Sequence, residues 1–185
     1  GGDFLYSDIE IRTMLKDIEI ARRLGADGVV FGCLTADGEV DLTSMQILME
    51  ASKGLSVTFH RAFDVCRNPQ KALEEIIELG CNRILTSGQQ PTAEQGIGLL
   101  KELQGLAAGR ITLLADCGVN ENNIARIAAE TGINEFHFSA RESIQSEMKF
   151  RNEVVSMGGT VHINEYERNV TSVRRVKETV EALYK

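Results

Sequence analysis

The sequence lacks an apolar run of the roughly 18 residues that a membrane-spanning helix requires. No leader-like segment precedes Asp3, so we expect a protein outside the membrane. Positive charge is also in short supply, because 20 Lys and Arg stand against 27 Asp and Glu, for a formal net charge of −7. This balance disfavours a nucleic-acid partner, since such domains usually present a basic surface. Walker, GxGxxG and GxSxG motifs are absent too, which removes the usual support for nucleotide-binding and α/β-hydrolase functions.

No CxxC pair is present, although the chain has four cysteines: Cys33, Cys66, Cys81 and Cys117. A chain of 185 residues does not need disulfides for stability, so we expect reduced thiols in a cytoplasmic protein. With 43% hydrophobic and 25% charged residues, the composition is that of an ordinary globular domain. No linker-like segment interrupts it, and we expect a single domain over residues 1–185.

Short β-branched runs alternate with helical patterns along the first 140 residues. Strands are predicted at 28–32, 57–61, 83–87, 111–115 and 135–139, and helices from Ser7, over 42–51, from Asn68, from a cap at Thr92 and Gln95, and from Asn120. Residues 140–168 are less regular, so we predict a long segment with only local structure there. Residues 171–184 are predicted to form a C-terminal helix.

Strands that alternate with helices imply a parallel sheet, and here they recur about every 24 to 28 residues. This period is typical of a (β/α) TIM-type barrel or of an open α/β sheet. A closed eight-stranded barrel usually takes about 250 residues, yet five strands occupy everything before residue 140. The opening segment, Gly1–Tyr6, resembles a loop that follows a strand. We therefore predict an α/β fold that is an incomplete barrel of about five parallel strands.

Binding groups in parallel α/β proteins gather at the carboxyl ends of the strands. Alternation puts Val57 and Phe59 on one face of their strand and His60 on the other. The same reasoning separates Phe136 from His137 in the last strand. If the apolar sets pack against helices, both histidines point inward near the mouth. Histidine changes charge near neutral pH, so each is a candidate proton carrier, and the alternative is a structural hydrogen-bonded histidine.

Arg61 and Asp64 complete the set of candidate catalytic side chains. An arginine at a barrel mouth can hold a carboxylate or phosphate, and Asp64 could orient it or His60. The alternative is a bridge that only stiffens the loop. Small residues after the later strands would let backbone N–H groups approach an anion. The candidates for this substrate-binding or anion-binding role are Ser87, Gly88, Gln89, Gly118, Ser139 and Arg141. Asp116 brings negative charge beside Gly118, which argues against a strong phosphate cradle in that loop.

A metal site is the third possibility at this mouth. Cys33 follows the first predicted strand and could share the mouth with His60. Thiolate and imidazole suit copper(I) or zinc, but no pair of ligands has a short diagnostic spacing. His162 lies in the irregular segment and is a weaker candidate.

Five stretches taken together resemble the CutC family, whose members are described as copper homeostasis proteins. They are GGDFLYS (1–7), GADGVVFG (25–32), VTFHRAFD (57–64), RILTSG (83–88) and EFHFSA (135–140). The resemblance runs in order over residues 1–140 and is thinner beyond 145. It implies a (β/α) barrel with three strands ahead of the GGDF motif, so that this chain would hold strands four to eight. The cysteines proposed as copper(I) ligands in the family lie on the strands that this chain lacks.

Three hypotheses follow for function. The first is a cytoplasmic CutC-like protein of copper homeostasis that binds copper ion. The second is an enzyme that acts on a small anionic substrate, phosphorylated or not, with His60 and His137 as proton carriers and Arg61 as anion clamp. The third is a fragment without activity whose exposed sheet edges invite pairing. Whether the chain is an enzyme stays open. We expect a metal ion or small molecule as ligand, no nucleic acid or membrane partner, and a homo-oligomer.

Overall fold

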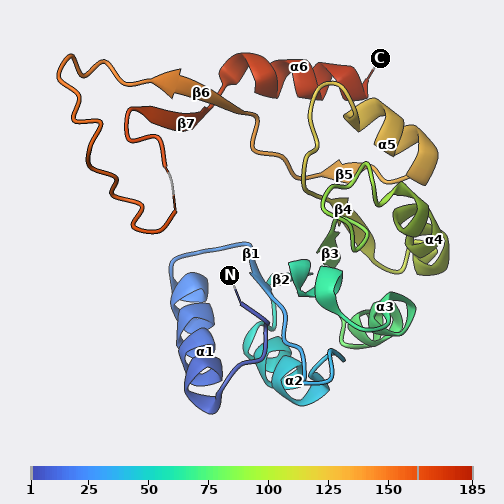
Figure 1. The fold of residues 1–185 in the computed structure, drawn as a ribbon. Helices are drawn as coiled ribbons and strands as arrows, with labels where there is room; N and C mark the ends of the chain where they lie inside the picture. Colours follow the sequence, from blue (N-terminus) through green and yellow to red (C-terminus); the bar gives the residue numbers. More distant parts are fainter. Residues whose placement is uncertain (1, 162, 185) are drawn as a thin grey trace. The chain divides into compact units, whose positions relative to one another are not determined.

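The computed structural model describes residues 2–161 and 163–184 of the chain (Figure 1). Contacts between residues divide it into two compact units. The first comprises Gly1–Val119 and Arg126–Phe138, and the second comprises Asn120–Ala125 and Ser139–Lys185.

The first unit is built around a parallel sheet of five strands in the order β1-β2-β3-β4-β5. The strands are β1 (Gly28–Phe31), β2 (Ser56–Phe59), β3 (Arg83–Thr86), β4 (Thr112–Ala115) and β5 (Glu135–Phe136). Neighbouring strands in the sheet are also consecutive along the chain, and a helix lies between the members of each pair. The predicted parallel α/β architecture is therefore confirmed.

Most helices of this unit begin where the sequence signals them. They are α1 (Asp8–Arg23), α2 (Leu42–Ala51), the short 3-10 helix η1 (Arg61–Val65), α3 (Pro69–Glu78), α4 (Ile97–Ala107) and α5 (Ile124–Thr131), whose first two residues belong to the second unit. Ahead of α1, the Glu10 carboxylate accepts a hydrogen bond from the Ser7 backbone N–H, and the Ser7 side chain accepts from the Glu10 backbone N–H, which together form a capping box. Ahead of α3, the Asn68 side chain accepts from the backbone N–H of Lys71.

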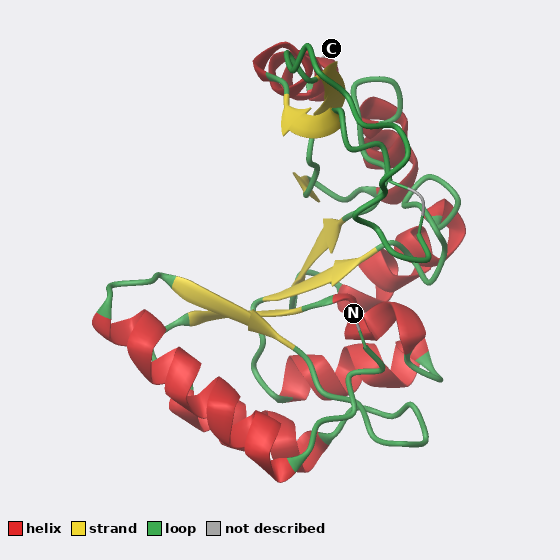
Figure 2. Ribbon diagram, turned by 60° about the vertical axis from the view of Figure 1, so that its left-hand side comes forward, coloured by secondary structure: helices red, strands yellow, loops and turns green. Residues whose placement is uncertain are grey.

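One face of the sheet carries the core. Val57 and Phe59 on β2 are 1% and 0% exposed, whereas Thr58 between them is only half-buried. Figure 2 shows the helices of this unit gathered along one side of the strands. On the opposite face, Val30 of β1 is 60% exposed. The predicted alternation of buried and exposed residues along the strands thus agrees with the structure, in which the buried apolar side chains face the helices.

Two departures from the predicted bounds concern the loops after β3 and β5. Thr92 and Gln95 form a hydrogen-bonded turn, and α4 begins only after Gly96, because the cap signal closes a turn that precedes the helix. The last strand ends at Phe136, so His137 follows β5 instead of lying within it. The His137 backbone N–H still donates to the Ala115 carbonyl, which keeps it beside the end of β4.

The second unit contains an antiparallel hairpin and a helix. Its elements are β6 (Arg141–Gln145), β7 (Glu167–Thr171) and α6 (Val173–Leu183). The two strands of the hairpin border residues 146–166, which have no regular helix or strand among the described residues, and α6 begins within about two residues of the start predicted for the helix at 171–184. No helix in the described part of the chain is long and apolar enough to cross a membrane.

Candidate functional site

The candidate residues of the first unit lie at the carboxyl ends of its strands. Because β1 to β5 are parallel, these ends share one edge of the sheet, which we call the rim. His60 and η1 follow β2, the loop 87–89 follows β3, the loop 116–118 follows β4, and His137 follows β5. The rim therefore brings together groups that are far apart in the sequence.

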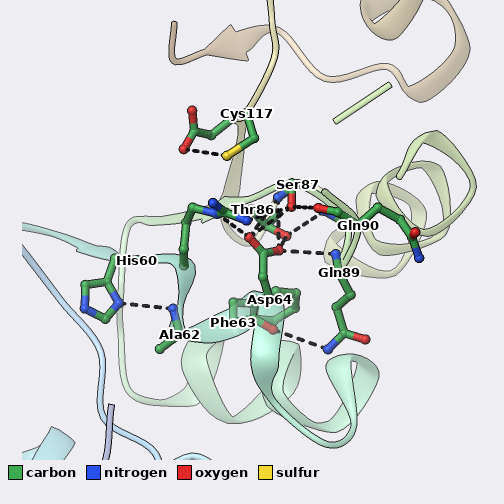
Figure 3. A network of polar contacts seen from close by, with 12 residues as sticks. His60, Ala62, Phe63, Asp64, Thr86, Ser87, Gln89, Gln90 and Cys117 are labelled. Carbon is green, nitrogen blue, oxygen red and sulfur yellow. Dashed lines mark hydrogen bonds and ion pairs between the residues drawn. The ribbon is translucent and has the colours of Figure 1, made fainter. Parts of the chain in front are cut away.

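Asp64 is the most densely bonded group at the rim (Figure 3). Its side chain is 5% exposed and forms an ion pair with Arg61 Nε at 2.7 Å. The Thr86 hydroxyl donates to the same carboxylate at 2.6 Å, as do the hydroxyl of Ser87 at 3.1 Å and the backbone N–H groups of Ser87 at 3.0 Å and Gln89 at 3.2 Å. A nearly buried carboxylate with this many donors is held in one orientation.

The loop after β3 thus binds a carboxylate, that of Asp64, which belongs to the same chain. The backbone N–H groups of Ser87 and Gln89 donate to Asp64, and that of Gly88 donates to the Thr86 hydroxyl at 2.9 Å. Gln89 also ties the loop to η1, since its side-chain amide donates to the Cys66 carbonyl at 2.8 Å. In this structure these donors are occupied within the chain, and those of Ser87 and Gln89 hold Asp64, while a role for Ser87, Gly88 and Gln89 at an external anion stays a prediction.

Arg61 is fixed at one side and open at the other. Besides the Asp64 contact, one of its terminal nitrogens donates to the Ser87 hydroxyl at 3.2 Å, while the side chain remains 40% exposed. Burial lowers the pKa of Arg61, but the hydrogen bond and charge of Asp64, with smaller contributions from Cys117 and Asp116, more than offset this and raise it. The site therefore presents a permanent positive charge in a defined orientation.

A carboxylate–imidazole pair follows β4 and β5 at the rim. His137 Nδ1 lies 2.9 Å from Asp116 Oδ1, and the side chains are 61% and 15% exposed respectively. The Cys117 thiol contacts the other Asp116 oxygen at 3.5 Å. Burial, and next the charge of Asp116, raise the pKa of Cys117 to about 11, so its sulfur is a thiol. Sequence reasoning noted Asp116 only as a negative charge, although its place directly after β4 could have marked it as a partner for His137.

His60 is more enclosed than His137. Its ring centroid lies 4.8 Å from that of Phe4, and its Nδ1 accepts a hydrogen bond from the Ala62 backbone N–H at 3.3 Å. A Cβ atom at Gly32 would come within 2.8 Å of the same ring nitrogen, so the ring packs against the backbone there. Burial lowers the pKa of His60, and the imidazole is therefore neutral with its proton on Nε2.

The cysteine proposed as a metal ligand does not present a usable thiolate. Cys33 is 1% exposed, and burial raises its pKa to about 12. Among the described residues, no group of three or more His, Cys, Asp or Glu side chains is arranged to hold a metal ion. The site around Cys33 and His60 does not fit a metal centre on these grounds. His162 lies outside the described residues.

The remaining candidates divide between the two units. Gly118 belongs to the rim, where its φ of +74° is a conformation that a side chain would strain, and an added Cβ would meet Thr92 at 3.1 Å. Ser139 and Arg141 belong to the second unit. Arg141 begins β6, and its backbone carbonyl accepts a hydrogen bond from Arg175.

Two cavities of the first unit lie at opposite ends of the strands. A cavity of about 410 Å³ at the rim is bounded by the loop after β1 and the end of η1, including Leu34, Gly38 and Val65. A cavity of about 550 Å³ lies at the amino ends of β2 and β3, where Lys53 and Asn82 contribute to its lining. Only the first is on the edge where the paired charges gather.

Fold and site together define an incomplete (β/α) barrel of TIM type with charged groups at the carboxyl ends of its strands. The CutC family model matches residues 1–142, and the chain belongs to the CutC family. A CutC family protein of Bacteroides thetaiotaomicron is 78% identical over 99% of this chain and 74% of its own length. A relative from Parabacteroides distasonis is 56% identical over 96% of this chain and 73% of its own length.

Solved structures agree with this assignment. The crystal structure of a CutC protein from Streptococcus agalactiae, assigned there to copper homeostasis, is 35% identical to this chain. It superposes with a TM-score of 0.71 over 74% of this chain and 67% of that one. An aldolase at 18% identity matches with a TM-score of 0.56, which shows the fold alone. The predicted resemblance to CutC and the predicted fold class are confirmed.

Proposed function

We propose that this CutC-family chain carries an enzyme-type site at the rim, which binds a small molecule bearing a carboxylate or phosphate and moves a proton on it. Arg61 holds the anionic group, and His137 is the proton carrier. His60, neutral and with Nε2 as its remaining donor, supplies a hydrogen bond at the wall of the site.

The observation that carries this proposal is the geometry of Arg61. Its guanidinium is fixed by a nearly buried carboxylate and by the Ser87 hydroxyl, yet 40% of the side chain stays open to solvent. A purely structural bridge gains little from leaving its cation exposed. A binding arginine that is already oriented loses less conformational entropy when an anion arrives.

The test compares two variants, each of which replaces one arginine with glutamine and so removes one positive charge. We expect inorganic phosphate or a small carboxylate such as malonate to raise the melting temperature of the wild type and of Arg110→Gln, but not that of Arg61→Gln. Arg110 is a suitable control because it also pairs with a carboxylate, Glu74, and is 45% exposed. Equal ligand-induced shifts in both variants would remove Arg61 from the site.

Copper(I) handling in the cytosol is the second candidate function. It is favoured by the similarity to the Streptococcus agalactiae protein and by a sulfur pair, since Cys81 Sγ lies 3.7 Å from Met49 Sδ. Copper(I) prefers such soft ligands, and the four cysteines are free thiols, as in a reducing compartment. Cys81 is buried and its pKa is raised to about 12, as for Cys33, so a copper(I) ion would have to displace the thiol proton. Competition with bicinchoninate measures the copper(I) bound by wild type, Cys33→Ser and Cys81→Ser. Loss of one bound ion in Cys81→Ser supports this function, and unchanged stoichiometry in both variants contradicts it.

We also propose that the chain forms homo-oligomers. β1 is one end strand of the sheet, and Val30 on it is 60% exposed. Unpaired strand edges pair readily with another chain. Light scattering after gel filtration tests this proposal, and a monodisperse monomer at all concentrations would refute it.

A further inference from the structure

Asp116 and His137 form a carboxylate–imidazole pair at the rim. Their Oδ1 and Nδ1 atoms are 2.9 Å apart. The carboxylate is the better buried partner, with 15% of its side chain exposed against 61% for the histidine. The buried member of the pair is thus the one that can hold the other in place.

Contacts within the chain anchor both members. The Asp116 backbone N–H donates to the Thr86 carbonyl at 3.0 Å, and the His137 backbone N–H donates to the Ala115 carbonyl at 2.9 Å. The Cys117 thiol contacts the second oxygen of Asp116. The chain itself thus holds the pair in place, which is what an efficient proton-transfer site requires.

A carboxylate can only accept a hydrogen bond, so the contact places the imidazole proton on Nδ1. The lone pair of His137 then sits on Nε2, the nitrogen away from Asp116. His60 has the reverse arrangement, because its Nδ1 accepts from the Ala62 N–H. The two rim histidines therefore have opposite tautomers and different chemical capacities.

We propose that Asp116 is a positioning residue that makes His137 a proton acceptor through Nε2, and that the substrate is an anion with an acidic C–H or O–H beside the group held by Arg61. This inference rests on the proposed function. In the step, the His137 Nε2 lone pair forms the new N–H bond as the substrate C–H or O–H bond breaks. The bonding electron pair stays on the substrate atom. Asp116 remains ionised and stabilises the imidazolium, which returns the proton to substrate or solvent, so nothing is oxidised or reduced.

The test is the tautomer of His137 in the full chain labelled with ¹⁵N at histidine, read from long-range ¹H–¹⁵N spectra at alkaline pH. We expect Nδ1–H for His137 and Nε2–H for His60 in the same spectrum, with the His137 signals assigned from their loss in His137→Gln. Asp116→Ala should shift His137 toward the Nε2–H form. Asp116→Asn should retain Nδ1–H because its amide oxygen still accepts.

Two results would overturn the inference. One is a wild-type His137 that is mainly Nε2–H, and this measurement needs no variant to fold. The other is an unchanged His137 tautomer in a folded Asp116→Ala protein. The tautomer does not depend on phosphate binding. If phosphate does not bind but His137 is observed as Nδ1–H, the proposed role of Arg61 in binding an anion is wrong. The positioning role of Asp116 is still supported in that case.

Discussion

Replacing Asp64 with alanine tests the arrangement on which the rim depends. The substitution removes a carboxylate that is 5% exposed and accepts from Arg61, Thr86, Ser87 and Gln89. A hydrogen bond to a charged group contributes about 1.5–3 kcal/mol, and breaking a buried ion pair costs about 3–5 kcal/mol. These contributions overlap and do not add. Because Arg61 can be rehydrated at its open side, we expect a loss of about 3–5 kcal/mol in the free energy of unfolding.

Urea unfolding followed by circular dichroism measures this loss. Asp37→Ala is the matched control, because Asp37 also pairs with an arginine, Arg67, but at the longer distance of 3.7 Å and with 84% of its side chain exposed. An exposed pair of this kind contributes about 0–1 kcal/mol. If Asp64→Ala lowers the free energy of unfolding by less than about 1 kcal/mol, the Asp64 carboxylate does not hold the loop after β3. The explanation given above for the orientation of Arg61 is then wrong.

Three further predictions concern the first unit. Gly96→Ala should destabilise the protein by about 1–3 kcal/mol, because its Cβ would lie 1.9 Å from the Ser87 carbonyl oxygen. Gly98 lies in the first turn of α4, which Gly96 caps, and a Cβ there meets nothing within 4 Å, so Gly98→Ala should stabilise the protein by about 0.5–1 kcal/mol. Thermal denaturation that ranks the two variants in reverse would contradict the packing. Burial lowers the pKa of His60 below 6.5, so the unfolded chain takes up its proton first and stability should fall as the pH drops from 6.5 to that lower pKa. His60→Gln should flatten this fall in urea midpoints, and identical profiles would refute the burial argument. Cys33, with a pKa raised to about 12, should react with iodoacetamide at pH 8 only as fast as the protein unfolds, and rapid labelling of the native chain would count against its burial.

The sequence predicted the parts of the fold that local rules control. The capping box at Ser7 and Glu10 and the cap ahead of Pro69 mark helix starts because they satisfy backbone groups within a few residues. The alternation of Val57 and Phe59 identified the face that packs under the helices. It also placed His60 and His137 near the carboxyl ends of predicted strands, and in the structure these ends lie on the same side of the parallel sheet.

The contacts of the site could not be predicted in the same way. Asp64 meets Thr86 and Ser87 only because η1 folds back over the end of β3, a non-local arrangement without a sequence motif. The hairpin of β6 and β7 was missed for a different reason. Three of the five residues of β6 and four of the five of β7 are exposed, so neither strand has the buried apolar alternation that reveals a strand in sequence.

We infer that the loops at the carboxyl ends of the strands form a single ligand site at the rim. A ¹H–¹⁵N titration with inorganic phosphate tests it most directly, because every loop reports separately in one spectrum. We predict saturable shifts with a single dissociation constant in the loops after β2, β3 and β4 and at His137. Shifts confined to the cavity at the amino ends of β2 and β3, around Lys53 and Asn82, would contradict the claim, and so would a spectrum that does not change.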